Sequence, residues 1–395
     1  MADSATASRL ARTPRGRSRF ELLFNPASLI LVCAIGLTLL GITVLFSASV
    51  SFRSDPYFFV RRQVTWLGIA LLVGFIAARV NLEKMRGLTW WIAGILLAGL
   101  VAVTIPGIGI EVNGARRWFE MGSVRLQISE FAKLGLVFAL AHYLARNQTD
   151  IGRLWKGFVL PLGGIGVVCV LMLLEPDFGT AMLTGAVGSI MLLLAGSRLR
   201  YLIPSVLLGA SAIGVAILYD PVRLARITSF LDIEGNRSDG AYQLWQAILA
   251  FGAGGVQGVG LGAGRQQMAF LPESHTDFIF AIVGEELSLP FTLAVVLAFL
   301  LIFIAGMIHL RRAPNLFQFL IVAGSLLLLT LQAIINLGVV TGLLPTKGIS
   351  LPFISYGGSN LLLMAVIVGL MLNTRTAWSR PLLRDRDREM KEVTA

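Results

Sequence analysis

The sequence predicts an all-α protein that crosses a membrane about ten times. Of its 395 residues, 56% are hydrophobic and only 14% are charged, and the mean hydropathy is +0.78. Soluble domains contain about 25% charged residues on average. The apolar residues also fall into runs of about 20, which is the length that a helix needs to cross a bilayer. Together these observations exclude an ordinary soluble protein.

The predicted spans follow one another along most of the chain, with one long interruption. They lie at about 27–47, 64–80, 88–105, 127–145, 157–174, 179–196, 200–219, 279–308, 315–340 and 358–373. Between the seventh and eighth spans, residues 220–278 form a long outer loop, which includes an amphipathic stretch at 241–251. The chain thus divides into a basic tail, 1–26, a ten-span domain, 27–373, and a charged tail, 374–395.

Basic residues are distributed unevenly between the two sides of the predicted membrane. About two-thirds of the Lys and Arg residues lie in the tails and in the loops on the side of the termini. Loops rich in Lys and Arg stay in the cytoplasm, so both termini are predicted to be cytoplasmic. The net charge of +11 would suggest a nucleic-acid partner in a soluble protein. Here most of that charge orients the chain, and no nucleic acid is predicted.

The most informative outer segment is Leu271–Phe278, where the long loop enters the eighth span. A carboxylate held at an apolar rim has a raised pKa because it is removed from water, and this suits a general base. Asp277 is therefore a catalytic candidate. The spacing of Ser274 and Asp277 also fits a helix capping box, and the sequence alone does not decide between capping and catalysis.

Two further acids, Glu285 and Glu286, follow within the predicted eighth span. If that span is one helix, Glu285 lies about 80° from Asp277 around the axis and about 12 Å deeper. Glu285 is then a candidate for the same cavity. Glu286 points to the opposite side and is expected to pair with a neighbouring helix.

Outer cations form a second group of candidates. Arg116 and Arg117 follow the third span, against the general preference for basic residues inside. Guanidinium groups bind phosphate oxygens in bidentate fashion, so a pyrophosphate ligand is one interpretation, and an interfacial anchor with Trp118 is the other. Glu130 and Lys133 are three residues apart, as in a helical ion pair, unless Lys133 also reaches an anionic ligand.

Outer turns rich in Gly and Pro complete the candidate site. In the turn 175–180, Asp177 is expected to cap the following helix. Segments 344–348 and 355–359 suggest irregular backbone that lines a cavity, to which Lys347 adds a cation. A glycine-rich stretch, 251–264, predicts a loop beside the site.

Taken in order, these motifs resemble the SEDS family (shape, elongation, division, sporulation), the polytopic glycosyltransferases of bacterial peptidoglycan. The resemblance extends over about 25–373, and the segment Thr346–Gly348 is closer to the division branch of the family than to its elongation branch. The motifs that carry it are Asn113–Trp118, Ser129–Lys133, Glu175–Thr180, Leu271–Glu286 and Leu344–Ser359.

The resemblance implies that the protein polymerises lipid II on the outer face of the bacterial cytoplasmic (inner) membrane, at the division septum. It implies that Asp277 is the catalytic residue. The substrate-binding candidates are Arg116, Arg117, Glu130, Lys133, His275, Lys347, Ser355 and Ser359. No cofactor is implied, and a divalent cation is left open. The expected partners are lipid II, undecaprenyl pyrophosphate, a class B penicillin-binding transpeptidase and other membrane proteins of the division machinery.

Two other function classes remain open at this stage. A lipid II flippase or another amphiphile transporter would suit ten spans with Glu285 and Glu286 inside one of them. Against transport, the charges gather at the outer rim, and no inverted repeat with paired broken helices is visible. A noncatalytic scaffold of the division machinery is the third class.

Overall fold

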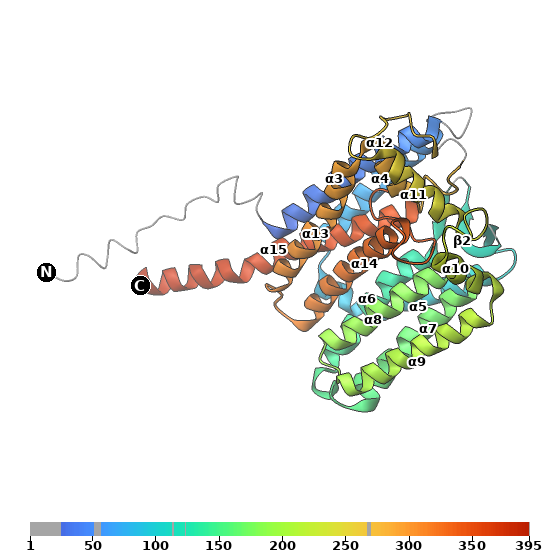
Figure 1. Cartoon of the computed structure of the whole chain (residues 1–395). Helices are drawn as coiled ribbons and strands as arrows, with labels where there is room; N and C mark the ends of the chain where they lie inside the picture. The colour runs from blue at the N-terminus through green and yellow to red at the C-terminus, as the bar shows by residue number, and fades with distance from the viewer. Residues whose placement is uncertain (1–24, 51–56, 113, 123, 267–269, 395) are drawn as a thin grey trace.

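The protein is a bundle of membrane-length helices with a small β-sheet at one end (Figure 1). The structure is a computed structural model that describes residues 25–50, 57–112, 114–122, 124–266 and 270–394. The basic tail up to Phe24 and the first residue of one motif, Asn113, therefore lie outside the described residues.

The membrane helices occur where the apolar runs predict them. Within the described ranges, nine helices are long and apolar enough to span a bilayer, and α8 is a shorter apolar helix of 17 residues. This pattern confirms a polytopic helical fold with about ten spans. The helices are α3 (Pro26–Val50), α4 (Phe58–Arg79), α5 (Leu82–Thr104), α6 (Ile128–Arg146), α7 (Leu160–Leu174, preceded by a π-helix at Trp155–Val159), α8 (Phe178–Leu194), α9 (Leu199–Leu218), α10 (Pro221–Leu231), α11 (Tyr242–Gly254), α12 (Ile279–Leu287), α13 (Leu289–Leu310), α14 (Leu316–Val340) and α15 (Gly358–Thr394).

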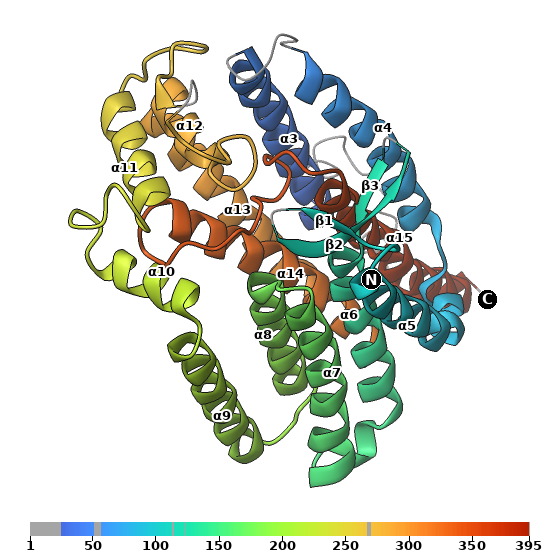
Figure 2. The same ribbon diagram turned by 90° about the vertical axis from the view of Figure 1, so that its right-hand side faces the viewer.

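The centre of the bundle is formed by α6, α14 and the membrane part of α15. In an apolar stretch of 18 residues within each of these helices, between 67% and 72% of the residues are buried, whereas in α9 only 6% are. Helix α9 lies at the edge of the molecule, apart from α7 and α8 over much of its length (Figure 2). Helices that are buried all round can carry polar side chains only where those chains find partners. The polar residues of α6 and α14 are therefore candidates for a functional site.

The predicted eighth span, 279–308, is two helices rather than one. Helix α12 ends at Leu287, and α13 begins at Leu289 after Ser288, which has a φ of 96°. Pro290 in the first turn of α13 has no N–H and disfavours helix before it, so the chain breaks here. The N–H of Leu289 donates instead to the carbonyl of Gly255 at 3.2 Å.

The predicted helical fold carries one small addition. The loop after α5 forms an antiparallel sheet of order β1-β2-β3, with β1 at Ile110–Val112, β2 at Ala115–Met121 and β3 at Val124–Gln127. Strand β3 leads directly into α6. The sheet therefore sets the position of the first turn of α6.

The long segment between α9 and α12 also contains regular structure. Helix α10 is capped by Asp220, whose carboxylate accepts from the N–H groups of Val222 and Arg223. Helix α11 covers the amphipathic stretch that the sequence predicts at 241–251. These two helices, the sheet and α12 gather at the end of the bundle opposite the C-terminal end of α15 (Figures 1 and 2).

Candidate active site

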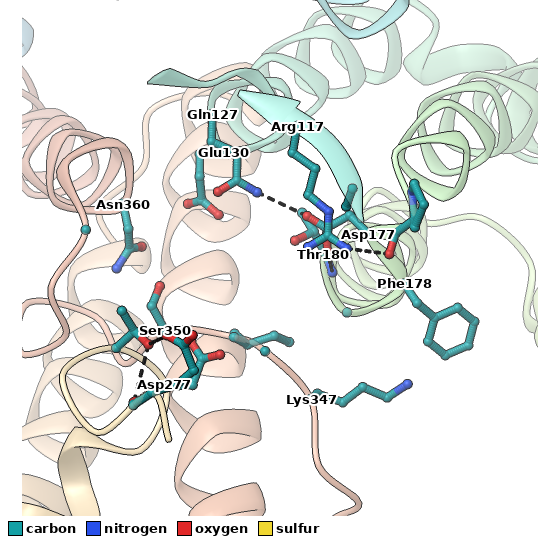
Figure 3. A pocket seen from close by; sticks show the side chains of 18 of the residues that line it. Arg117, Gln127, Glu130, Asp177, Phe178, Thr180, Asp277, Lys347, Ser350 and Asn360 are labelled. Carbon is teal, nitrogen blue, oxygen red and sulfur yellow. Dashed lines mark hydrogen bonds between the residues drawn. The ribbon is translucent and has the colours of Figure 1, made fainter. Parts of the chain in front are cut away.

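A cavity of about 1070 Å³ opens at this end of the bundle (Figure 3). Its walls come from the sheet, the first turns of α6 and α8, helix α10, and the loops that precede α12 and α15. These segments are far apart in the sequence, and several of them carry the predicted motifs. Of the candidates, Arg117, Glu130, Lys133, His275, Asp277, Lys347 and Ser359 line the cavity.

Asp277 lies on an irregular turn and not in a helix. Helix α12 begins two residues later, at Ile279, and no side chain caps it. The hydroxyl of Ser274 is buried without a hydrogen-bond partner in the described structure. The capping-box interpretation of Ser274 and Asp277 is therefore wrong, and the carboxylate of Asp277 is left to the cavity.

The turn that carries Asp277 is held from behind by two other segments. The Asn336 amide on α14 donates to the carbonyl of Asp277 at 2.8 Å. The hydroxyl of Ser355 donates to the carbonyl of Thr276 at 2.6 Å and accepts from the N–H of Leu351 at 2.7 Å. Because these bonds use backbone groups of the turn, they fix its position and leave the carboxylate side free.

The immediate surroundings of the Asp277 carboxylate favour its neutral form. Removal from bulk water, together with the nearby charges of Glu273 and Asp177 and against the charge of Arg117, raises the pKa of Asp277 to about 7. A Cβ atom at Gly348 would lie 3.0 Å from Oδ2 of Asp277, so a larger residue there would displace the carboxylate by a few tenths of an ångström. A carboxylate that titrates near neutral pH is well matched to general base catalysis.

A buried polar network lies beside Asp277 on α6 and α14. The Lys133 ammonium donates to Oε1 of Glu130 at 2.9 Å and to Oε1 of Gln332 at 3.0 Å. The amide of Gln332 donates in turn to Oδ1 of Asn360 and to the carbonyl of Ser350, both at 2.9 Å. Lys133 is only 2% exposed. The predicted ion pair exists, and both of its members also line the cavity.

Strand geometry separates the two adjacent arginines. Successive side chains of a strand point to opposite faces, so Arg116 and Arg117 on β2 cannot face the same way. Arg117 lines the cavity and donates to the carbonyls of Glu175 at 2.8 Å and Pro176 at 2.6 Å. Arg116 does not line the cavity and forms an exposed ion pair with Glu111 at 3.2 Å.

The turn between α7 and α8 contributes two acids with different surroundings. Asp177 caps α8 through the N–H of Thr180 at 3.2 Å, as the sequence indicates, and also accepts from Gln127 at 3.1 Å on the cavity wall. Glu175 is fully buried, and burial followed by the charge of Asp177 raises its pKa to about 8. At neutral pH Glu175 is therefore mostly protonated.

Two further predicted residues have structural roles behind the cavity. Ser355 does not line the cavity and instead fastens the Asp277 turn. Glu285 also lies outside it, and its carboxylate accepts from the N–H groups of Arg265 and Gln266. These bonds hold the end of the glycine-rich loop against α12. The neighbouring Glu286 carboxylate accepts from the hydroxyl of Ser47 on α3 at 2.7 Å.

Two cations of the cavity wall, Arg223 and Arg226 on α10, are not among the residues predicted from the sequence. The only signal was Asp220-Pro221, which predicts a helix start, followed by two arginines three residues apart. No group of three His, Cys, Asp or Glu side chains in the described ranges is placed to hold a metal ion.

The comparison with known proteins agrees with this architecture. A model of the FtsW, RodA and SpoVE cell cycle proteins matches residues 27–379. A probable peptidoglycan glycosyltransferase FtsW from Hahella chejuensis is 40% identical over 346 residues, covering 86% of this chain and 87% of the relative. One of the same name from Coxiella burnetii is 40% identical over 355 residues, covering 87% and 94%.

Solved structures show the same likeness. A chain from a peptidoglycan synthase complex that coordinates polymerization and crosslinking matches with a TM-score of 0.76 and 27% identity, covering 88% of this chain and 97% of that one. The rod shape determining protein RodA of Thermus thermophilus matches with a TM-score of 0.66 and 27% identity, covering 87% and 94%.

Proposed function

Because this chain belongs to the FtsW, RodA and SpoVE family of cell cycle proteins, we propose that its cavity polymerises lipid II into glycan strands. The protein is a multi-pass membrane protein and a peptidoglycan glycosyltransferase of the division type, as its relatives' names indicate. Its cavity would act at the outer face of the bacterial cytoplasmic membrane, at the septum.

The observation that carries this proposal is one near-neutral carboxylate, that of Asp277, in a cavity whose other walls carry cations. Glycosyl transfer from a lipid-linked donor needs a base for the attacking hydroxyl and positive charge for the departing pyrophosphate. Asp277 supplies the first requirement. Arg117 and Lys133 meet the second from two different elements, β2 and α6.

The proposed reaction is a single displacement with inversion at the anomeric carbon. Asp277 takes the proton of the GlcNAc 4-hydroxyl of the acceptor as that oxygen bonds to the anomeric carbon of the donor. The bond from that carbon to the pyrophosphate breaks, and undecaprenyl pyrophosphate leaves with the electron pair. Cations already in place stabilise its developing charge without the need to reorganise. The donor is already activated, so no nucleotide is required.

A partner protein follows from the same likeness. The structurally similar chain belongs to a peptidoglycan synthase complex in which polymerization and crosslinking are coordinated. Crosslinking requires a transpeptidase, so we expect this chain to work with a class B penicillin-binding transpeptidase and with other division proteins in the membrane.

The test is polymerisation by the full-length protein, purified with a transpeptidase partner whose own active site is inactivated. With lipid II supplied, the wild-type protein should produce glycan strands, and D277N should not. D239N is the matched control because Asp239 lies exposed in the same outer segment, away from the cavity. Normal polymerisation by D277N would overturn the base assignment. If neither the wild-type protein nor D277N polymerises lipid II but both move it between leaflets, the transporter function would be favoured.

A further inference from the structure

Two cations contact one aromatic ring on the cavity wall, and a third cation on α10 lines the same wall. The ammonium of Lys347 lies 4.0 Å from the centre of the Phe178 ring, and the guanidinium of Arg223 lies 5.1 Å from it. Arg226, one turn further along α10, lines the same wall. We refer to Lys347, Arg223 and Arg226 as the cation cluster.

The positive charge of the cation cluster is only partly compensated. Arg223 forms an ion pair with Asp220 at 2.9 Å, and both side chains are about one-third exposed. Burial and the charges of Arg226 and Arg223 lower the pKa of Lys347 to about 8. Three cations held this close repel one another, which favours binding of an anion with more than one negative charge.

The cation cluster lies where a hydrocarbon chain would meet an aqueous cavity. Helix α10 directly follows α9, most of whose apolar side chains are exposed. Ile217 at the end of α9 and Val222 at the start of α10 line the cavity together with the two arginines. An amphiphile with its tail along α9 would therefore place its phosphates beside α10.

Asp277 and the cation cluster occupy different parts of the cavity. Figure 3 shows the Lys347 side chain pointing toward Phe178 and away from Asp277, with Arg117 on a third side. Arg117 acts electrostatically on Asp277, whereas Lys347 is influenced by the arginines of α10. The cavity thus offers two separate regions of positive charge, one coupled to Asp277 and one remote from it.

We propose that the cation cluster binds the pyrophosphate of the acceptor lipid, the substrate whose sugar hydroxyl Asp277 activates. This inference rests on the proposed function. The donor's pyrophosphate is bonded to the reacting carbon and must lie near Asp277. The acceptor's pyrophosphate is separated from the reacting hydroxyl by the disaccharide, so it needs a second, more distant group of cations. Arginine suits this role because one guanidinium group can bind two phosphate oxygens at once.

Binding and kinetics test the proposal in the full-length protein, reconstituted in nanodiscs with its inactivated transpeptidase partner. The double variant R223Q/R226Q should raise the KM for lipid II by at least about tenfold and change kcat by less than about threefold. R237Q is the matched control, since Arg237 is exposed on the same outer segment and lies outside the cavity lining. An unchanged KM, or a fall in kcat alone, would overturn the proposal.

A binding measurement separates this inference from the polymerase assignment. Lipid II binding is measured in the D277N background, where no turnover is expected, and R223Q/R226Q should weaken it at least about tenfold. Undecaprenyl pyrophosphate should displace the bound lipid, and undecaprenol should not. Equal displacement by undecaprenol would show that the tail alone is recognised and would refute the proposal. If wild-type protein does not polymerise but these binding results hold, only the polymerase function fails.

Discussion

The inner wall of the cavity, Glu130, Lys133, Gln332 and Asn360, is buried and hydrogen-bonded, whereas the cation cluster is partly exposed and holds one ion pair. In this buried wall every side chain has at least one hydrogen-bond partner, and of its buried side-chain polar atoms only Oε2 of Glu130 has none, so the geometry is set before any substrate arrives. In an exposed wall, charges can exchange water for a ligand at little cost. The inner wall therefore suits chemistry and the cation cluster suits binding.

Removal of the base is expected to have the largest effect on activity. D277N keeps the size of the side chain but cannot accept the proton, so polymerisation should fall by about 10²–10⁴-fold. The Tm in detergent should not fall, because the turn is held through its backbone by Asn336 and Ser355. The rate of glycan-strand formation and the Tm are the two measurements. A large fall in Tm would indicate that Asp277 has a structural role.

Breaking the inner wall should affect stability more than any change in the cation cluster. K133M leaves Glu130 buried without its cation, and loss of one partner of a buried ion pair costs about 3–5 kcal/mol. Thermal unfolding in detergent measures this cost. K156M is the control, because Lys156 pairs with Asp150 at the surface and its loss should cost about 0–1 kcal/mol. Equal shifts for both variants would contradict the contrast between buried and exposed pairs.

The adjacent arginines of β2 provide a test within a single strand. R117Q removes two charge-assisted hydrogen bonds to the turn before α8, so it should destabilise that turn by about 1.5–3 kcal/mol and reduce polymerisation. R116Q removes an exposed ion pair and should cost at most about 1 kcal/mol with little change in rate. Unfolding and polymerisation measured side by side would show the difference. A larger effect of R116Q would mean that the strand faces are reversed.

The pH dependence should have opposite signs for rate and stability. The base must be deprotonated, so the rate should rise with pH and level off above about 7, with about a tenfold loss per pH unit below. Because the pKa of Asp277 is raised in the folded state, the folded protein binds the extra proton between about pH 4 and 7. Its contribution to the free energy of unfolding therefore falls as pH rises through that range.

Two variants check the origin of this profile. D277N should abolish the pH dependence of the residual rate near neutral pH. R117Q removes a charge that lowers the pKa of Asp277, so it should move the midpoint of the rate profile to higher pH. Rates of strand formation over pH 5–9 give both results. A midpoint unaffected by R117Q would show that Arg117 and Asp277 are not coupled.

The sequence predicts those features of the fold that form between residues close together along the chain. Apolar runs predict membrane helices because a helix satisfies its own backbone in lipid. The cap at Asp177 and the ion pair of Glu130 with Lys133 are also local, since each joins residues three apart. The break at Ser288 was not predicted because apolar residues lie on both sides of it, although Pro290 marks the position.

By itself, the sequence determined a polytopic helical protein and pointed to Asp277, Lys133 and Lys347 as residues with chemical roles. Only the tertiary structure decided that Arg117 faces the cavity and Arg116 does not, and that Ser355 and Glu285 support loops. It also decided that α10 brings Arg223 to Phe178 and Arg226 to the cavity wall. The reason is sequence distance. Asn336 holds Asp277 from 59 residues away and Ser355 holds Thr276 from 79, and no local pattern records such contacts.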